Sequence, residues 1–429
     1  MDARVKLTGE VQLGKDGRKT YASLADAGAA IQESQAKDAT ELFLAILRAA
    51  IAFNASDIHF ETEENGVKIR LRVDGILQDT AVLEPKEYEG LLSRVKLVSR
   101  IKLNVQDRPQ DGRFTLETGE GLPLETRVSS LPSQFGESLV IRLLNPKNLR
   151  AFKDLALRPD LVEIFAREIR RPNGMILVTG PTGSGKTTTL YAFLQEVKNS
   201  EIKIITIEDP IEYHLEGVSQ TQVQGKEYTF ASGLRAIVRQ DPDVILVGEI
   251  RDPETADIAI QAALTGHLVF STLHTNDSAG TIARLLSLGG NAQSIAAAIN
   301  LVIAQRLVRQ VCETCERAEP LTEKEYEFIQ RELEHIPDHL KKPLSPATAV
   351  VRAKGCEKCG HTGYRGRIGL YEALVIDDPL RIFISKNPSI AELRDYAKQH
   401  GLVTVLQDGL LKMLDGATTM EEILRVAAE

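Results

Sequence analysis

The sequence predicts an α/β protein in which a smaller α+β domain precedes a larger domain built on a mostly parallel sheet. Three observations support this fold class. Within residues 38–145, short segments with alternating apolar and polar residues flank one helical segment. From about residue 155, apolar strand-like runs alternate with helical segments, as in sheets joined by crossover helices. A glycine-rich turn, Gly180–Thr187, joins one of these runs to the helical segment after it.

The composition restricts the class of protein. With 429 residues, of which 43% are hydrophobic and 26% charged, the chain is long enough for about three domains with buried cores. Its longest apolar run, Leu42–Leu47, is far shorter than the ~20 residues of a membrane span, and the N-terminal region lacks a signal-peptide core. We therefore expect a cytoplasmic protein. The net charge of −8, without a polybasic tail, argues against general nucleic-acid binding.

The first segment, residues 1–37, is rich in Gly, Ala, Lys and Asp and shows little periodicity. We expect it to be a linker or a truncated N-terminal region. Asp38, with Glu41 three residues later, resembles a capping box, and the apolar spacing after it predicts an amphipathic helix.

The α+β domain, residues 38–145, continues with strands around a second helix. A hairpin turn is expected at Asp74-Gly75, and a helix over Lys86–Ile101. Residues 146–154 are expected to form the linker to the larger domain at 155–429. The first strands expected are Asp57–Phe60, Val67–Val73 and Ile76–Leu83, with three more strand-like pieces ending at Leu144.

The larger domain has four candidate strands with polar residues or glycine after each. In sheets of this kind a ligand lies at the carboxyl ends of the strands, so the residues that follow each strand are site candidates. Residues 375–429 are expected to be helical and to pack against the domain or against another subunit. The candidate strands are 175–179, 202–207, 243–247 and 268–273.

The turn Gly180–Thr187 fits the pattern G-x-x-x-x-G-K-[ST] in its required place between a strand and a helix. Backbone N–H groups of such a turn can surround a polyphosphate. Lys186 would reach the β- and γ-phosphates, and the Thr187 hydroxyl would bind Mg²⁺. The chain is therefore expected to bind a nucleotide. The predicted binding residues are Gly180, Pro181, Thr182, Gly183, Ser184, Gly185, Lys186, Thr187, Thr188 and Asp209.

Three carboxylates follow two of the apolar strands. Glu208 and Asp209 come after the second strand, and Glu249 comes after the third, with Gly248 where such enzymes usually have Asp. A carboxylate in this position can orient an attacking water or hold the water shell of Mg²⁺. A solvated strand end is the alternative for any one of them, but the three together favour a site.

Two histidines flank the fourth strand, His267 at its start and His274 after its end. A single histidine is more often a structural hydrogen-bonding group than a catalytic one. Either histidine could instead donate to the γ-phosphate and respond to its loss.

Four segments in order resemble the secretion and pilus-assembly motor ATPases, which include the type II secretion traffic ATPase and the type IV pilus extension ATPase. The resemblance covers about residues 39–429. The matching segments are Gly180–Thr187, Ile204–Glu212, Arg239–Asp252 and Thr265–Asn276.

This resemblance implies a RecA-like ATPase domain behind a smaller α+β domain, in a hexameric ring that binds the nucleotide between the two domains. It implies that Glu208 is the general base, that Glu249 serves Mg²⁺, and that His267 and His274 sense the γ-phosphate. From the residues alone, the metal role could fall on Glu249, on Glu208 or Asp209, or on a mixture of them.

The resemblance also places catalytic arginines on the smaller domain. Arg113 and Arg127 match best among the arginines there, and an arginine near the γ-phosphate would stabilise the transition state. The alternative is a pair of surface arginines. As fingers, they would couple closure of one domain on the other to hydrolysis.

The four cysteines form two Cys-x-x-Cys pairs, which in a cytosolic protein indicate a metal site more than disulfides. Four thiolates make a closed tetrahedral zinc site within an insertion at 312–359. A redox pair and free thiols are the alternatives. The insertion resembles that of assembly motors and not of retraction motors. The ligands would be Cys312, Cys315, Cys356 and Cys359.

The sequence thus predicts a Mg²⁺–ATP-driven hexameric motor that powers pilin or pseudopilin assembly. From the resemblance we expect an inner-membrane platform protein and a docking protein as partners, with the chain peripheral to the inner membrane through them. A DNA-handling ATPase of conjugation or competence, and a nucleotide-gated scaffold without useful turnover, are the alternatives.

Overall fold

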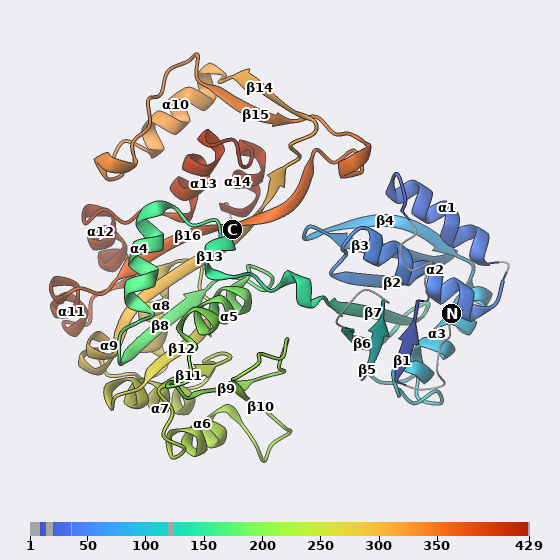
Figure 1. Cartoon of the computed structure of the whole chain (residues 1–429), viewed down its shortest axis with the longest axis horizontal. Helices are drawn as coiled ribbons and strands as arrows, with labels where there is room; N and C mark the ends of the chain where they lie inside the picture. Colours follow the sequence, from blue (N-terminus) through green and yellow to red (C-terminus); the bar gives the residue numbers. More distant parts are fainter. Residues whose placement is uncertain (1–8, 14–19, 36, 119–122, 428–429) are drawn as a thin grey trace. The chain divides into compact units, whose positions relative to one another are not determined.

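The computed structural model describes residues 9–13, 20–35, 37–118 and 123–427, and the chain divides into two compact units (Figure 1). The first unit comprises Met1–Asn148 together with two cysteine-bearing segments, Cys312–Cys315 and Lys354–Arg365. The second comprises Leu149–Val311, Glu316–Ala353 and Gly366–Glu429. The chain passes from one unit to the other within the segment that the sequence predicts as a linker.

The first unit contains a sheet with strand order β1-β5-β6-β7-β2-β3-β4. Its neighbouring strands run antiparallel, except that β1 pairs with β5 in parallel. The elements of this unit are β1 (Glu10–Gln12), α1 (Leu24–Gln35), α2 (Ala39–Ala52), β2 (Asp57–Glu63), β3 (Gly66–Val73), β4 (Ile76–Leu83), α3 (Pro85–Val98), β5 (Gln110–Glu117), β6 (Leu124–Ser133) and β7 (Gly136–Leu144).

Local sequence signals explain several of these elements. Helix α2 begins after Asp38, whose Oδ1 accepts hydrogen bonds from the backbone N–H groups of Thr40 at 2.8 Å and Glu41 at 2.9 Å. Between β3 and β4, Asp74 and Gly75 have φ values of 49° and 88°, as a two-residue hairpin turn requires. Both the helix start and the hairpin therefore agree with the prediction from sequence.

Part of the segment expected to be a linker is folded. Within residues 1–37, the described residues form β1 and α1, and Ala27 and Ile31 on α1 are fully buried in the core of the first unit. Val11 on β1 is also fully buried. Strand β1 is only three residues long, and few side chains of α1 are buried. Neither element therefore shows a clear hydrophobic periodicity in the sequence.

The second unit contains a sheet with strand order β10-β9-β11-β12-β8-β13-β16, and its strands from β10 to β13 pair in parallel. The strands are β8 (Gly174–Thr179), β9 (Ile204–Glu208), β10 (Ser219–Gln222), β11 (Val244–Val247), β12 (Leu268–Leu273), β13 (Ile299–Val311) and most of β16 (Tyr364–Val375), with a separate hairpin of β14 (Glu316–Pro320) and β15 (Ala349–Ala353).

The α-helices of the second unit follow these strands along the chain. They are α4 (Pro159–Glu168), α5 (Lys186–Val197), α6 (Phe230–Val238), α7 (Pro253–Leu264), α8 (Ser278–Ser287), α9 (Ala292–Ala298), α10 (Glu323–Glu332), α11 (Asp378–Ser385), α12 (Ile390–Gln399), α13 (Val405–Leu414) and α14 (Met420–Ala427).

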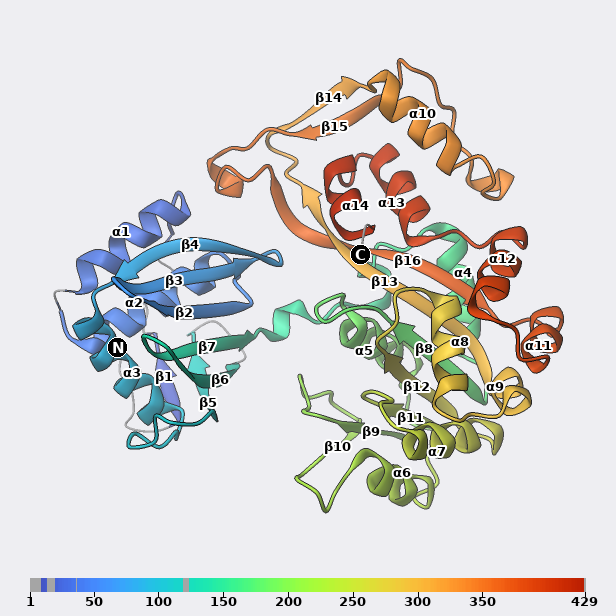
Figure 2. The same ribbon diagram turned by 180° about the vertical axis from the view of Figure 1, so that it is seen from behind.

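Helices cover both faces of this sheet because both faces of its central strands are apolar (Figure 2). On β8, Ile176 and Val178 pack with residues of α4 and α5, whereas Met175 and Leu177 pack with residues of α6 to α9, α11 and α12. Alternate residues of β9, β11 and β12 divide between the same two cores. The α/β fold predicted from sequence is confirmed.

A buried ionic network fixes the C-terminal helices in the second unit. Asp408 on α13 is fully buried and accepts hydrogen bonds from Arg158 Nη1 at 2.5 Å and from Lys412 Nζ at 2.8 Å. The backbone N–H of Tyr371 on β16 donates to the same carboxylate at 2.7 Å. Arg158 lies directly before α4, so this network joins the first helix of the unit to α13 and β16.

Among the residues that the structure describes, no helix combines the length and the apolar character needed to span a lipid bilayer.

Candidate functional site

The glycine-rich loop lies between β8 and α5 and rests on β13. Gly180, Gly183 and Gly185 have φ values of 146°, 81° and 89°, a region that L side chains rarely adopt. A Cβ atom at Gly180 would lie 2.4 Å from the carbonyl oxygen of Gln305 on β13, so the loop fits only without a side chain there. At Gly183 a Cβ atom would meet nothing within 4 Å. The loop therefore packs closely against β13 at Gly180, whereas the space beside Gly183 is empty.

Lys186 opens α5 and bonds to its own loop. Its Nζ donates to the carbonyl oxygens of Gly180 at 2.8 Å and Pro181 at 3.0 Å. Burial lowers the pKa of Lys186 to about 8 against the opposing effect of the Glu249 carboxylate, and the Arg306 guanidinium lowers this pKa further. A phosphate group bound here would place a negative charge beside the ammonium group and so stabilise its protonated form.

Glu249 follows β11 and meets residues from two other segments. Its Oε2 lies 2.5 Å from Arg251 Nε and 3.4 Å from His274 Nε2. Since Glu249 also acts on the charge of Lys186, the structure brings Glu249, His274 and Lys186 together at one edge of the sheet. Thr187 and Thr188 are half-buried in the first turn of α5. The Thr187 hydroxyl and the Glu249 carboxylate are oxygen donors of the kind that Mg²⁺ prefers.

Glu208 ends β9 and is buried, with 3% of its surface exposed. Its Oε1 accepts hydrogen bonds from Thr206 Oγ1 at 2.6 Å and from Gln220 Nε2 at 3.2 Å, and its Oε2 accepts one from the Tyr191 hydroxyl. Burial raises the pKa of Glu208, while these hydrogen bonds oppose the rise. The next residue, Asp209, is exposed.

The loop after β12 is tied by hydrogen bonds to β8 and β13, the strands next to the glycine-rich loop. The backbone N–H of Thr275 donates to Oγ1 of Thr179, the last residue of β8, at 2.8 Å. Arg306 Nη2 on β13 donates to the carbonyl oxygen of Asn276 at 3.2 Å. His274 lies at the start of this loop, half exposed. The loop that carries His274 is therefore held next to the glycine-rich loop through these two strands.

His267 does not lie with these residues. It precedes β12, which runs parallel to β8, so it lies at the amino ends of the strands, and the phosphate loop lies at the carboxyl ends. Its Nδ1 is 3.0 Å from the carbonyl oxygen of Ala262 in α7. The structure thus gives His267 a hydrogen bond at the end of a helix and does not support the γ-phosphate role expected of it.

Arg113 and Arg127 lie in the first unit on neighbouring strands. They are register partners across β5 and β6, and Arg127 is in turn the partner of Arg142 on β7. Arg113 is exposed and Arg127 is half-buried. Guanidinium groups opposite one another on one sheet face repel, so an anion bound there would be stabilised by both.

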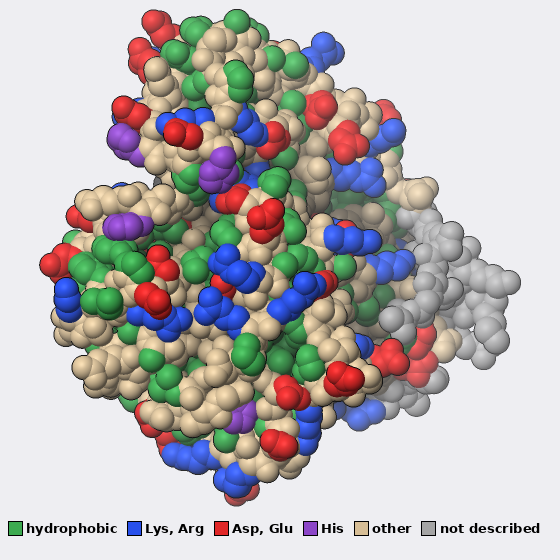
Figure 3. All heavy atoms as spheres, turned by 60° about the vertical axis from the view of Figure 1, so that its left-hand side comes forward, with side chains coloured by type: hydrophobic (Ala, Val, Ile, Leu, Met, Phe, Trp, Pro, Cys, Tyr) green, Lys and Arg blue, Asp and Glu red, His purple; other side chains and the backbone are tan. Residues whose placement is uncertain are grey.

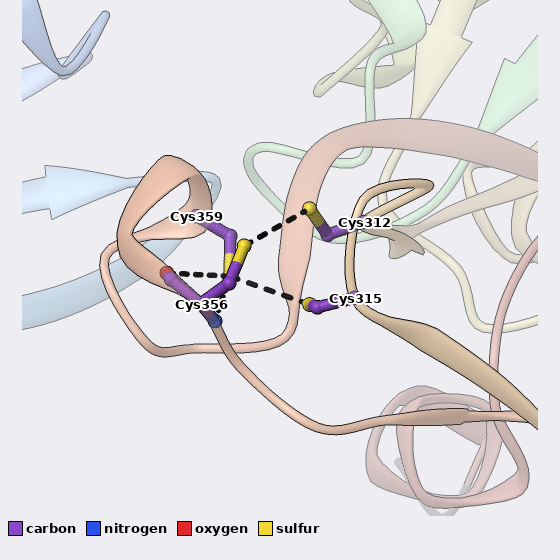
Figure 4. Close-up of side chains that lie close together, drawn as sticks. All are labelled: Cys312, Cys315, Cys356 and Cys359. Atoms are coloured by element: carbon purple, nitrogen blue, oxygen red, sulfur yellow. Dashed lines mark hydrogen bonds between the residues drawn. The ribbon is translucent and has the colours of Figure 1, made fainter.

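The four cysteines gather into one cluster, drawn in Figure 4 with the sulfur atoms turned toward one another. The Sγ–Sγ distances are 4.0 Å for Cys312–Cys356, 3.8 Å for Cys315–Cys359 and 3.8 Å for Cys356–Cys359. Four sulfur atoms held about 2.3 Å from a tetrahedral zinc ion would lie about 3.8 Å apart. The cluster therefore fits zinc, and at these distances no disulfide joins these cysteines.

Backbone groups support the same cluster. The N–H groups of Cys356 and Gly363 both donate to Cys359 Sγ at 3.2 Å. Each Cys-x-x-Cys pair forms a tight turn, with Cys315 N donating to Cys312 O at 3.0 Å and Cys359 N to Cys356 O at 3.2 Å. Such N–H···S contacts stabilise thiolates, the form in which cysteine binds a metal.

Several residues of the site were not predicted from the sequence. Tyr191 and Gln220, which hold Glu208, belong to an apolar helix and a short polar strand without a motif. Arg306 had a usable signal, since the apolar run Leu301–Ala304 before it predicts a buried strand, and the residue is indeed 5% exposed in the structure. A buried charge needs a partner, and this requirement alone could have directed attention to Arg306.

Comparison with known proteins gives matches over most of the chain. The family model described as Type II/IV secretion system protein matches residues 32–425. Type II secretion system protein E of Aeromonas hydrophila is 46% identical over 90% of this chain and 75% of that protein, and its counterpart from Pseudomonas aeruginosa is 46% identical over 98% and 82%. The type II secretion system ATPase E of Vibrio cholerae is 45% identical over 91% and 75%.

Solved structures give the same fold. The pilus retraction motor PilT with bound ADP has a TM-score of 0.58 at 26% identity, over 90% of this chain and 96% of that one. The Legionella pneumophila ATPase DotB has a TM-score of 0.64 at 23% identity, over 90% and 94%.

Proposed function

The chain belongs to the Type II/IV secretion system protein family and is an ATPase, and we propose that it is a motor driven by Mg²⁺–ATP for pilin or pseudopilin assembly in type IV pilus biogenesis or type II secretion. The observation that carries the proposal is the phosphate loop with Lys186, Glu249 and His274 gathered at one sheet edge.

The proposed roles follow from the positions of the side chains. The loop amides and Lys186 bind the phosphates, and the Thr187 hydroxyl and Glu249 would hold Mg²⁺, which would neutralise phosphate charge. Glu208 accepts a proton from the attacking water, and its pKa, raised by burial, suits a general base. His274 donates to the γ-phosphate and is released from it after hydrolysis. Together these groups can transfer a phosphoryl group to water.

Arg113 and Arg127 complete the proposed catalytic set as arginine fingers. Their guanidinium groups would stabilise the charge that spreads over the γ-phosphate oxygens in the transition state. The adjacent placement of the two arginines on β5 and β6 supports this role, because paired guanidinium groups suit an anion.

We propose that Cys312, Cys315, Cys356 and Cys359 bind a structural zinc ion. The sulfur separations support a four-thiolate site. Four protein ligands leave no open position for a substrate, so the metal would stabilise the fold and take no part in hydrolysis.

The proposed setting is a homo-hexamer in the cytoplasm, attached to the inner membrane through a platform protein and a docking protein of the machine. The names of the relatives, a type IV pilus assembly ATPase of Thermus thermophilus among them, support a place in a secretion or pilus machine. That pilus ATPase is 41% identical over 88% of this chain and 42% of its own length. The net charge of −8 disfavours the DNA-handling alternative, and the face drawn in Figure 3 carries acidic as well as basic side chains.

Lys186→Ala tests the proposal. We expect phosphate release from ATP to fall by at least about a hundredfold, since a charged group that contacts the phosphates is lost. Lys198→Ala, which removes an exposed lysine from the other end of the same helix, should leave turnover unchanged. Equal turnover in the Lys186 variant would exclude the loop from hydrolysis, and activation by single-stranded DNA would favour the DNA-handling function instead.

A further inference from the structure

Glu208 has a hydrogen-bonding partner on the helix that begins at the phosphate loop. We propose that Tyr191 is a positioning residue for Glu208, whose hydroxyl fixes the carboxylate oxygen that takes the proton from water. The inference rests on the proposed role of Glu208 as general base. None of the comparisons with known proteins assigns a role to Tyr191.

The position of Tyr191 makes its hydroxyl a rigid support. The residue is fully buried on α5, between Leu190 and Phe193 of the core that this helix shares with the sheet. Its ring packs edge-on against Tyr213, with the ring centroids 6.5 Å apart and the planes at 74°. A side chain held on both sides has little rotamer freedom, so its hydroxyl can direct the carboxylate of Glu208.

The residues of β9 explain why the carboxylate faces this helix. Ile204 of β9 belongs to the core on the α5 side, whereas Ile205 and Ile207 belong to the core on the opposite side. Because side chains alternate along a strand, Thr206 and Glu208 share the face of Ile204. The hydrogen bond between Tyr191 and Glu208 is therefore a consequence of strand register.

The two carboxylate oxygens of Glu208 are used unequally. Oε1 accepts hydrogen bonds from both Thr206 and Gln220, which fill its two lone pairs. Oε2 accepts from Tyr191 and keeps one lone pair. Oε2 is therefore the oxygen with capacity for a water molecule, and Tyr191 sets the direction of its remaining lone pair.

The same contact influences proton affinity. Two titratable groups face Glu208: the Tyr191 phenol from α5 and the Glu212 carboxylate from the segment after β9. The neighbouring strands add no charge, because β10 contributes the neutral Gln220 and β11 is followed by Gly248. Burial raises the pKa of Glu208, and the hydrogen bond from Tyr191 opposes this rise. Loss of the phenol hydroxyl would thus raise the pKa of Glu208 further.

The test is Tyr191→Phe in the full chain, assayed for ATP hydrolysis across pH. We expect kcat to fall by about tenfold to a hundredfold, the effect of one hydrogen bond to a charged group, while KM for ATP changes little. The acid limb of the kcat profile should move to higher pH, because the carboxylate must be ionised to act as a base.

Tyr371→Phe is the matched control. Tyr371 is a buried phenol in the same unit that donates to the backbone carbonyl of Leu155 at 3.0 Å and not to a carboxylate. This variant should melt at a lower temperature and keep the acid limb in place. An acid limb that moves equally in both variants would mean that Tyr191 acts only through stability.

A second comparison separates this inference from the function on which it rests. In a Glu208→Gln background, Tyr191→Phe should cause no further loss of kcat, because the two residues act as one unit. Turnover retained by Glu208→Gln alone would overturn the general-base role. If Glu208→Gln loses turnover while Tyr191→Phe keeps the kcat and the acid limb of the parent protein, only the positioning role would be overturned.

If Tyr191→Phe is too unstable to assay, a fluorinated tyrosine at position 191 replaces it. Its more acidic hydroxyl donates a stronger hydrogen bond, so the acid limb should move to lower pH. An unmoved limb in a protein that melts normally would overturn the inference.

Discussion

Lys186 donates hydrogen bonds to two carbonyl groups of its own loop. Its pKa of about 8 means that the amine gains or loses its proton near physiological pH. A bound triphosphate needs the protonated form of this amine and would raise its pKa. Nucleotide binding should therefore take up a proton near pH 8 and above.

This linkage predicts that ATP affinity falls as pH rises through about 8, since the free protein then holds Lys186 mostly neutral and must protonate it on binding. Titration with a fluorescent ATP analogue at pH 7, 8 and 9 measures the effect. Lys186→Arg keeps its charge over this range, so its affinity should vary less with pH. Equal pH dependence in the two proteins would mean that another group titrates.

At the scale of single residues, the sequence predicted which side chains follow the strands but not how each is held. Glu249 lies near enough to Lys186 to act on its pKa, because the parallel strands end at one edge. His267 was placed with the site through the resemblance to the motor ATPases, although it precedes β12 and the ligand side of such a sheet is at the carboxyl ends of its strands. The buried contacts of Glu208 depend on Tyr191 of α5 and Gln220 of β10, which belong to neighbouring elements and to no motif.

At the scale of elements, the two Cys-x-x-Cys turns hold four sulfur atoms close together at the ends of separate segments. Without a metal, four thiol groups offer one another only weak hydrogen bonds. We therefore expect the stability of these turns to depend on zinc.

Cys312→Ser should lower bound zinc well below about one ion per chain and lower the melting temperature by several degrees. Metal analysis and thermal unfolding of the purified protein measure both. Treatment of the parent protein with a chelator should bring its melting temperature to that of the variant. Full zinc content in Cys312→Ser would remove Cys312 from the metal site.

Element prediction from the sequence succeeded where the pattern was strong. Strand β4 matches its predicted bounds, and helix α2 begins directly after the predicted cap at Asp38. Helix α1 was missed because only a few of its side chains are buried, among them Ala27 and Ile31, too few for a hydrophobic period. Helix α3 ends at Val98, earlier than the predicted Ile101, and Arg100 just beyond it has a φ of 61° that no α-helix contains.

At the scale of the whole molecule, the proposed reaction needs residues of both units, because the phosphate loop belongs to the second and Arg113 and Arg127 to the first. The complete chain, and not the second unit alone, would then be the active ATPase.

Arg113→Ala should lower kcat by at least about a hundredfold while ATP affinity changes little, since a finger acts mainly on the transition state. Steady-state hydrolysis and ATP titration give the two quantities. Arg70→Ala is the control: Arg70 lies on β3 of the same sheet and pairs with Glu61 and Asp79. A loss of affinity in place of turnover would identify Arg113 as a binding residue.

The grouping of segments into units was only partly accessible from the sequence. The change from alternating strands to strand–helix repeats indicated two parts, and the structure divides the chain at Asn148. The cysteine segments were expected within the larger domain, whereas their contacts group them with the first unit. Their position in the sequence suggested that the cysteine segments belong to the larger domain, but contacts between residues distant in sequence determine the unit to which they belong.

The ionic network around Asp408 has a consequence for the order in which this protein can be made. Arg158 and Asp408 are 250 positions apart, so a ribosome adds 250 residues after the arginine before the arginine can meet this buried carboxylate. Until then Arg158 has only the partly exposed carboxylate of Asp160 as a partner, so its Nη1 stays hydrated, because burial of an unpaired polar group is costly. The second unit should therefore complete its folding late in translation, and nascent chains that stop before α13 should be substrates for chaperones and proteases.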